Sequence, residues 1–252
     1  MADKEPDLSW KINVEGTKNL IESLEKYSPN SFLLYSSSIS VYGDRLKIPW
    51  IKVGDSLIPS KDDEYAVTKI AAEKIIKNSK LDWTIFRLTA IMGEHKISEL
   101  MFHMPLDTPL EIATPEDTAR AFVNALNKKE QLSKKIFNLG GGEKCRIKYK
   151  DFLDISFKIA GLGKPDFPEK AFAEKNFHCG YYADGDELEN ILHFRKDTIK
   201  SYFEKQKEKS GHCQKFLTYI FKRFIIKQLI SKSEPLRSYL SKNIDSIQRF
   251  FN

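Results

Sequence analysis

The stretch that decides the fold reads Phe32-Leu33-Leu34-Tyr35-Ser36-Ser37-Ser38-Ile39-Ser40-Val41-Tyr42-Gly43-Asp44. In it, a short apolar run over residues 32–35 is followed directly by three serines. Such a run, bounded by polar residues, is typical of a buried strand in a parallel sheet that is covered on both faces. Ligands of open α/β sheets bind beyond the carboxyl ends of these strands. We therefore expect Ser38 and its neighbours to lie at a functional site.

A second motif, Tyr65-Ala66-Val67-Thr68-Lys69, opens an apolar-periodic run that predicts a helix, with Asp62 or Asp63 as its N-cap. Positions i and i+4 share a helix face, so Tyr65 and Lys69 should point the same way. An ammonium beside a phenol lowers the phenol's pKa, which would make Tyr65 a general acid or base. A hydroxyl such as Ser38 could then hydrogen-bond the substrate oxygen. By itself, the motif also describes a surface Tyr beside a solvated Lys.

Together the motifs resemble the extended short-chain dehydrogenase/reductase family, the NAD-dependent epimerase/dehydratase group. Residues 36–44 are similar to the family's Ser-Ser-Ser-Ala-Thr-Val-Tyr-Gly-Asp segment, and Asn13-Val14-Glu15-Gly16-Thr17 is similar to its Asn-Val-x-Gly-Thr. The likeness extends over roughly residues 7–200. It implies NAD or NADP as cofactor and a small-molecule substrate. By this resemblance the catalytic residues are Ser38, Tyr65, Lys69 and Asn13, and the cofactor-binding residues are these four with Thr89.

The family pattern begins with a strand, a Gly-rich turn and a helix that bind the dinucleotide pyrophosphate. No such turn precedes Asn13, and Gly140-Gly141-Gly142 does not have the G-x-G-x-x-G spacing. We therefore predict an α/β fold with a partial doubly wound, Rossmann-like parallel sheet, and an exposed apolar edge at Phe32–Tyr35. A misplaced start codon, a truncated gene and a complementing partner chain all remain open. The chain alone could accordingly be inactive.

The remaining pattern predicts the domain boundaries. A truncated NAD(P)-binding domain is expected over residues 1–195, with a small substrate lobe at about 93–114 and 143–195, followed by a basic helical tail over 196–252. Further strands are predicted at Trp83–Leu88 and Lys135–Leu139. Helices are predicted from Asn13 to about Lys26, from the N-cap Thr114 onward with Asp117 as a structural cap, at 149–160, and from Asp186 to Leu192.

The segment after Leu88 argues against a nucleotide sugar as substrate. Nucleotide-sugar epimerases resemble this segment but carry Asn where this chain has Ala90, and they clamp the diphosphate with arginines. Between Leu88 and Ala119 this chain has no Arg, and the lobe from Gly93 to Asp117 is short. The prediction is therefore NAD(P)-dependent hydride transfer, of the oxidoreductase or epimerase type, on a small alcohol or carbonyl.

The composition indicates the class of protein and its expected compartment. At 252 residues, with 30% charged and 41% hydrophobic residues, the chain reads as a soluble globular protein. It has no run of 18 apolar residues and no signal-peptide pattern, so we expect a cytoplasmic protein. The cysteines are odd in number and far apart, which predicts free thiols. The two histidines of the short lobe are too widely spaced to predict a metal site. These residues are Cys145, Cys179, Cys213, His95 and His103.

The positive charge is concentrated in the tail, where residues 195–252 hold 14 Lys/Arg against 5 Asp/Glu. Within residues 215–230, apolar side chains recur at helical spacing: Leu217, Ile220, Phe221, Phe224, Ile225 and Leu229. This amphipathic helix could dock on the body or on a second subunit, as in a homo-oligomer, or lie on an anionic membrane. Nucleic acid is the least favoured partner, because no binding motif is present. An alternative function is therefore a non-catalytic remnant that binds a partner or a membrane surface through its tail.

Overall fold

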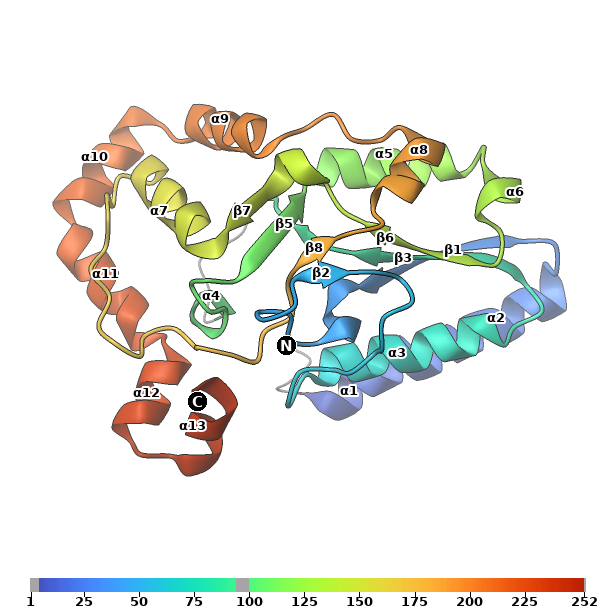
Figure 1. Cartoon of the computed structure of the whole chain (residues 1–252), viewed down its shortest axis with the longest axis horizontal. Coiled ribbons are helices and arrows are strands. Elements are labelled where there is room, and N and C mark those ends of the chain that lie inside the picture. The colour runs from blue at the N-terminus through green and yellow to red at the C-terminus, as the bar shows by residue number, and fades with distance from the viewer. Residues whose placement is uncertain (1–4, 94–99, 252) are drawn as a thin grey trace.

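The computed structural model describes residues 5–93 and 100–251. A central sheet of three parallel strands lies between two layers of helices, and a smaller helical lobe continues from one end of it (Figure 1). The strands are β1 (Phe32–Ser38), β2 (Trp50–Ile51), β3 (Asp82–Leu88), β4 (Ala90–Ile91), β5 (Pro109–Ala113), β6 (Lys135–Leu139), β7 (Arg146–Lys148) and β8 (Tyr181–Tyr182).

Helices make up most of the rest. They are α1 (Pro6–Trp10), α2 (Gly16–Tyr27), α3 (Glu64–Lys77), α4 (Leu100–His103), α5 (Pro115–Ala125), α6 (Lys129–Leu132), α7 (Tyr149–Ile159), α8 (Asp186–Leu192), α9 (Ile199–Lys209), α10 (His212–Ile220), α11 (Lys222–Ser231), α12 (Glu234–Leu240) and α13 (Ile244–Phe250). Among the described helices, none is both long and apolar enough to cross a membrane.

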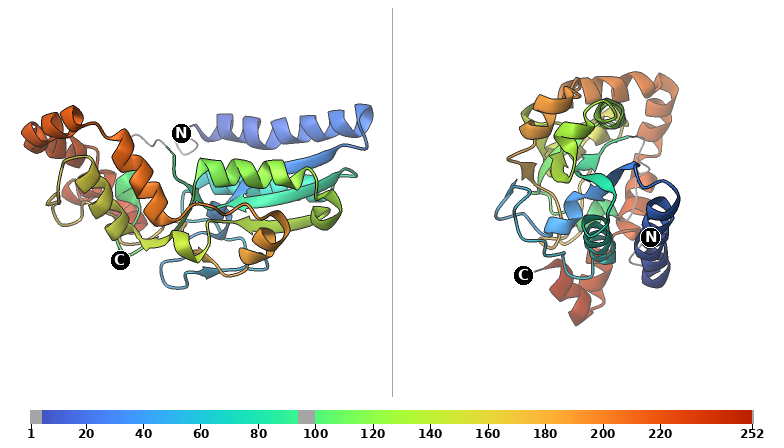
Figure 2. Two further views of the ribbon diagram at one scale, coloured as in Figure 1. Left: turned by 90° about the horizontal axis from the view of Figure 1, so that it is seen from above. Right: turned by 90° about the vertical axis from the view of Figure 1, so that its right-hand side faces the viewer.

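The central sheet has the order β1-β3-β6 and is parallel throughout, as predicted. Successive strand residues point to opposite faces. On one face Phe86 packs with Ala121 of α5, and on the other Ile85 packs with Ile21 of α2 and Ile76 of α3. Two covered faces explain why the strand segments read as continuous apolar runs in the sequence. Figures 1 and 2 show α2 and α3 on one side of the sheet and α5 on the other.

The helix before β1 begins earlier than predicted. α1 and α2 are joined without interruption by a π-helical turn, Lys11–Glu15, so Asn13 lies inside a helix and not at its start. Val14 and Ile21 are buried, whereas Leu20 is 51% exposed. Among the described residues, α3 and the sheet cover only one side of α2, and Leu20 lies on the other.

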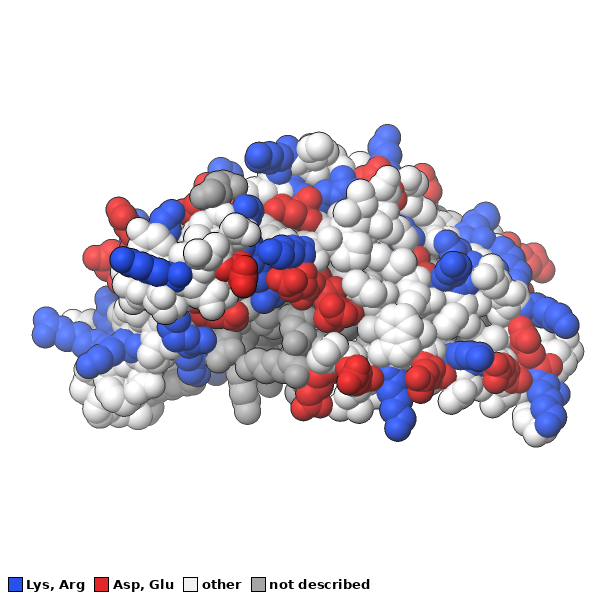
Figure 3. Space-filling view, turned by 90° about the horizontal axis from the view of Figure 1, so that it is seen from below, with Lys and Arg blue, Asp and Glu red and all other residues white. Residues whose placement is uncertain are grey.

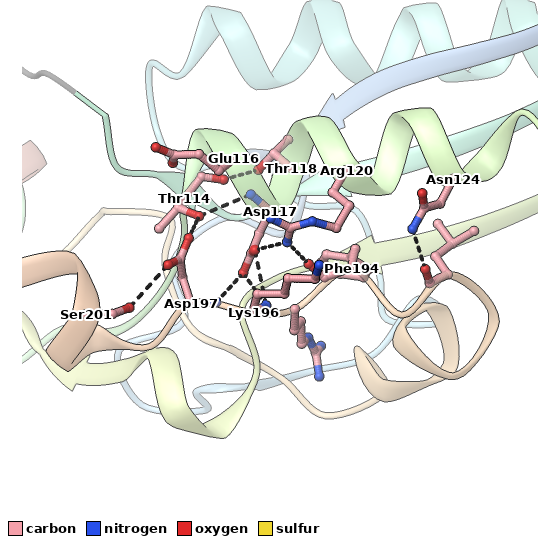
Figure 4. Close-up of polar contacts among 12 residues, drawn as sticks. Thr114, Glu116, Asp117, Thr118, Arg120, Asn124, Phe194, Lys196, Asp197 and Ser201 are labelled. Atoms are coloured by element: carbon pink, nitrogen blue, oxygen red, sulfur yellow. Dashed lines mark hydrogen bonds and ion pairs between the residues drawn. The ribbon is translucent and has the colours of Figure 1, made fainter. Parts of the chain in front are cut away.

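The helix starts at α3 and α5 follow the sequence signals. The Asp63 carboxylate accepts a hydrogen bond from Ala66 N at 2.9 Å, whereas Asp62 lies outside the cap. Thr114 accepts one from Asp117 N at 3.2 Å. The carboxylate of Asp117 in turn accepts hydrogen bonds from the backbone N–H groups of Lys196 and Asp197, each at 3.0 Å. It also forms an ion pair with Arg120 (Figure 4). Asp117 therefore holds the chain entering α9 against α5, which is a structural role.

The second lobe has its own apolar core. β5 pairs with β4 in parallel and with β7 in antiparallel orientation, and β2 pairs with β8. Phe102, Phe152 and Phe157 share one cluster with Tyr202 of α9 and Leu229 of α11. Part of the basic tail is thus packed on the lobe. The single amphipathic helix predicted over 215–230 is broken at Phe221 into α10 and α11.

Candidate active site

The carboxyl end of β1 meets the first turn of α3, and this brings Ser38 and Tyr65 together. Ser38 is the last residue of β1. Its hydroxyl caps the following 3₁₀ turn by accepting a hydrogen bond from the backbone N–H of Ser40 at 3.1 Å. The same hydroxyl is a hydrogen-bonding neighbour of the Tyr65 phenol, and this contact lowers the pKa of Tyr65. Two hydroxyls from different elements therefore converge where parallel sheets bind their ligands.

Burial decides the protonation state of Tyr65. Removal from water is the largest effect on its pKa and raises it, the Ser38 hydrogen bond partly opposes this, and the charge of Asp63 adds to the rise. The net pKa is raised, whereas the sequence predicted that Lys69 would lower it. The Lys69 ammonium lies 5.6 Å from the centre of the Tyr65 ring and is engaged elsewhere. At neutral pH the Tyr65 phenol in this chain is therefore protonated.

Lys69 projects from α3 toward the edge strand. Its Nζ donates to the Ser36 carbonyl at 2.9 Å and lies 3.4 Å from the hydroxyl of Tyr35. Burial lowers the pKa of Lys69, and the carboxylate of Glu73, one turn further along α3, counteracts this. Of the three groups around the ammonium, helical spacing places only Glu73, at i+4, beside Lys69, whereas Ser36 and Tyr35 come from another element.

Tyr35 is a member of this group that the sequence analysis missed. The Lys69 ammonium lies 4.8 Å from the centre of its ring. The pKa of Tyr35 is raised well above its usual value, first by burial and then by the charges of Tyr65 and Glu73. Its place in the apolar run favoured a packing role. The strand's two-residue alternation sets Tyr35 and Leu33 on the face that packs against α2 and α3.

A buried ion pair lies behind the site. Glu73 and Arg87 are 1% and 2% exposed, and Arg87 binds the carboxylate with two N–H groups, at 2.9 and 2.7 Å. Ser37 donates to the same carboxylate at 2.6 Å. Burial alone would lower the pKa of Arg87, but the contacts with Glu73 and Tyr42 outweigh burial and raise it. The signal that could have found the pair is a Glu on the inward face of an otherwise apolar helix.

The Arg87 guanidinium extends the polar network across the sheet. It donates to the Tyr42 hydroxyl at 2.8 Å, and this hydroxyl donates to Asn138 on β6, also at 2.8 Å. Asn138 donates to Asp184 at 2.8 Å. Because α3, β3 and β6 are linked through these bonds, the helix that carries Tyr65 and Lys69 has a fixed position on the sheet.

The other two predicted residues lie around this centre. Asn13 donates from its amide to the Thr68 hydroxyl at 3.1 Å, so it contacts α3 next to Lys69. π-Helical turns such as the one carrying Asn13 are frequent at functional sites. Thr89 is buried at 5% exposure and donates to the Glu111 carbonyl at 2.6 Å, which ties its side chain to β5. No contact in the described residues links Thr89 to Tyr65.

The residues fit one end of a dinucleotide. Tyr65, Lys69 and Ser38 could hold a ribose and the reacting oxygen of a substrate. The glycines of the 140–142 turn offer no open cradle for a pyrophosphate, because a Cβ at Gly140 would meet Glu111 and one at Gly142 would meet Arg195. Within residues 5–93 and 100–251 we find no G-x-G-x-x-G turn between a strand and an α-helix.

Every arginine described between residues 5 and 195 is already paired with a carboxylate. This leaves no free guanidinium in that region to clamp a diphosphate. The pairs are Arg45–Asp55, Arg87–Glu73, Arg120–Asp117, Arg146–Glu111 and Arg195–Asp186.

The described part of the chain also contains no group of three His, Cys, Asp or Glu side chains placed to hold a metal. His103 lies 2.9 Å from Glu234 and packs on Phe250. His95 lies outside the described residues. Cys145 and Cys179 are free and buried.

The N-terminal part of the chain matches a known protein family. The profile of the NAD dependent epimerase/dehydratase family matches residues 2–106. The GDP-6-deoxy-D-mannose reductase of Pseudomonas aeruginosa is 34% identical over 84 residues, which cover 33% of this chain and 26% of that protein. A UDP-glucose 4-epimerase of Schizosaccharomyces pombe is 34% identical over 97 residues, which cover 36% and 27%. The chain thus spans about a quarter of the length of the curated relatives it matches.

Solved structures extend the likeness in fold to most of the chain. The UDP-glucuronic acid 4-epimerase of Bacillus cereus, in complex with UDP-glucuronic acid and NAD, superposes with a TM-score of 0.62 at 20% identity. The superposition covers 86% of this chain and 68% of that one. The RMD protein of Pseudomonas aeruginosa, complexed with NADPH, gives a TM-score of 0.63 at 20% identity and covers 83% and 76%. The arrangement is therefore Rossmann-like α/β.

Proposed function

Because residues 2–106 match the profile of the NAD dependent epimerase/dehydratase family, we propose that this chain takes part in NAD(P)-dependent hydride transfer on a small alcohol or carbonyl. The observation that carries the proposal is the meeting of the Ser38 and Tyr65 hydroxyls, with Lys69 on the same side of α3. When bound, the nicotinamide supplies the hydride acceptor or donor. The chain itself has to bind and orient the substrate oxygen and to move a proton.

The proposed proton carrier is Tyr65. At neutral pH the Tyr65 phenol carries its proton and can donate it to a carbonyl oxygen as that oxygen gains charge, while its raised pKa makes it a weaker acid than a free phenol. Ser38 can donate to the same oxygen and position it. In the oxidation direction the phenol must first lose its proton, and the nearby ammonium of Lys69 would stabilise the phenolate. Asn13 would act as a positioning residue through Thr68.

A small substrate is favoured over a nucleotide sugar. The relatives named above act on nucleotide sugars, which carry a diphosphate. Arginine is the residue best suited to clamp one, and the arginines of residues 5–195 are all engaged in pairs with carboxylates.

Thermal unfolding with NADH and NADPH tests this function. A ligand at 100 times its Kd stabilises the folded state by roughly 2.7 kcal/mol, which is a readily visible shift. We expect a shift with one dinucleotide, its loss in Lys69→Met, and its retention in Lys74→Met, which changes an exposed lysine of the same helix. In any form that turns over a substrate, Tyr65→Phe should abolish the reaction. If neither NADH nor NADPH shifts the unfolding temperature, dinucleotide binding by this chain is refuted.

A partner for the edge of the sheet is a second part of the proposal. In the described sheet, β1 pairs only with β3, and most of its residues are half-buried. An edge strand of this kind can accept a further strand, from a complementing chain or from a second copy. Light scattering on a size-exclusion column should then give a mass above the 29.1 kDa of one chain, or should do so once the complementing chain is added.

The second candidate function is a non-catalytic remnant that binds a partner or membrane through its tail. The apolar side chains that the tail leaves uncovered favour it. If tail-dependent binding is found without any dinucleotide shift, this candidate replaces the first.

A further inference from the structure

α10 and α11 carry a contiguous set of large apolar side chains on the outside of the molecule. Each is between 54% and 70% exposed, and all fall within nine consecutive residues: Phe216, Leu217, Tyr219, Ile220, Phe221 and Phe224. Scattered exposed apolar residues are ordinary, but a contiguous patch of this kind marks an interaction site. We call these six residues the outer patch.

The outer patch is additional to the surface that holds these helices on the body. Leu229 is buried in the core of the lobe, and Ile225 and Ile226 pack against it. This inner surface is sufficient to dock α11. In the outer patch, Leu217, Ile220 and Phe221 have the i, i+3, i+4 spacing of one face of α10 and its C-cap, and Phe224 lies in the first turn of α11. The helices therefore have two apolar faces, and only one of them is covered in the described structure.

The charge around the outer patch has a single sign. Residues 209–233 contain six Lys or Arg and no Asp or Glu, so this segment alone carries +6. At the lower left of Figure 3, the end formed by α10 and α11, blue side chains project around white surface. Aromatic and aliphatic side chains bordered by Lys and Arg form the pattern of helices that lie in a membrane interface.

We propose that α10 and α11 bind the surface of a bilayer that contains anionic lipids. The outer patch enters the boundary between headgroups and acyl chains, and the surrounding Lys and Arg side chains contact lipid phosphates. A second copy of this chain fits the same surface poorly. A two-fold contact would place the patch and its basic residues against themselves, and the like charges would repel. This inference is independent of the hydride transfer proposed above.

An adjacent groove repeats the same chemistry. It lies between α7, α9 and α10, has a volume of about 570 Å³, and has an apolar floor that includes Ile155 and Phe203. Its rim carries four lysines, among them Lys207 and Lys215, and one glutamate. Lys215 belongs to α10 as well. The groove thus adjoins α10 through Lys215 and offers a second apolar surface bordered by lysines.

Flotation of the full chain with vesicles tests the proposal. We expect binding to vesicles of phosphatidylcholine and phosphatidylglycerol, at least tenfold weaker binding to phosphatidylcholine alone, and loss of binding at high salt. Phe216→Ser/Phe221→Ser/Phe224→Ser should weaken binding at least tenfold. The control Val123→Ser/Leu126→Ser removes two apolar side chains of similar exposure, 61% and 64%, from α5 and its C-cap, and should bind normally.

A charge-reversal pair separates electrostatic from apolar contributions. Arg223→Glu/Lys227→Glu should also weaken binding at least tenfold, while Lys47→Glu/Lys144→Glu, an equal charge change at exposed sites elsewhere, should not. Equal binding to neutral and anionic vesicles by the unchanged chain would overturn the proposal, whether or not any variant folds. So would self-association without lipid that the serine variant abolishes, since this would assign the patch to a second copy. The thermal shift with NADH or NADPH should be unaltered in every one of these variants.

Discussion

The buried pair of Glu73 and Arg87 offers a sharp test of how the candidate site is held in place. Glu73→Gln keeps the shape of the side chain but removes the charge that compensates Arg87. Arg87 is 2% exposed and its guanidinium uses two N–H groups on Glu73, so its charge would be left buried without a compensating negative charge. Breaking a buried pair in this way costs about 3–5 kcal/mol. That is a large part of the roughly 5–15 kcal/mol by which domains are stable.

Urea unfolding measures this cost, and a multiple variant separates the ion pair from packing. For a chain of this size, 3–5 kcal/mol corresponds to a fall in Tm of roughly 6–20 °C. Ser37→Ala/Glu73→Leu/Arg87→Met removes all three polar partners together. It should lose only about 1–3 kcal/mol, because Tyr42 keeps its bond to Asn138.

An exposed ion pair provides the control. Glu22 lies 3.8 Å from Lys18 with its side chain 61% exposed, so Glu22→Gln should change stability by less than about 0.5 kcal/mol. The reasoning is refuted if Glu73→Gln costs less than about 1 kcal/mol, or if the triple variant is less stable than Glu73→Gln alone.

Three further outcomes are expected. Burial raises the pKa of Cys145 and Cys179 from 9.0 to about 12, so the folded state holds these protons longer. The free energy of unfolding should therefore fall as the pH rises from 9 toward 12, and at pH 8 mass spectrometry should find neither thiol alkylated until urea is added. Asp117→Ala should cost about 1.5–3 kcal/mol and remove hydrogen-exchange protection from the two backbone amides, of Lys196 and Asp197, that donate hydrogen bonds to its carboxylate; unchanged protection would contradict the structural role. Leu229→Ala, at 5% exposure, should cost about 2–5 kcal/mol, and Leu217→Ala, at 54%, less than about 0.5; equal costs would mean that α11 is not docked through its inner face.

Local signals in the sequence were sufficient for the three strands of the central sheet and for several of the helices. The apolar runs over residues 32–35 and 83–88 predicted parallel strands; the structure has them as β1 and β3, and β1 extends through the serines to Ser38. The caps at Asp63 and Thr114 fixed two helix starts. These predictions succeed because strand burial, capping and i+4 spacing depend only on neighbouring residues. The resemblance to the epimerase/dehydratase family came from the same short motifs.

Tertiary structure alone decided the electrostatics of the site. Sequence spacing placed Lys69 beside Tyr65 but could not show that Ser36 and Tyr35 engage the ammonium or that burial dominates the pKa of the phenol. The Glu73–Arg87 pair is likewise hidden, because its partners lie on different elements and meet only when α3 packs on β3.

The tail shows the same division. Its apolar and basic residues are evident in the sequence, but which apolar side chains are buried is not. The break at Phe221 and the docking of Leu229 leave the outer patch uncovered. Helical periodicity records that a face is apolar, whereas contact with the rest of the chain determines whether that face meets a core or the surroundings.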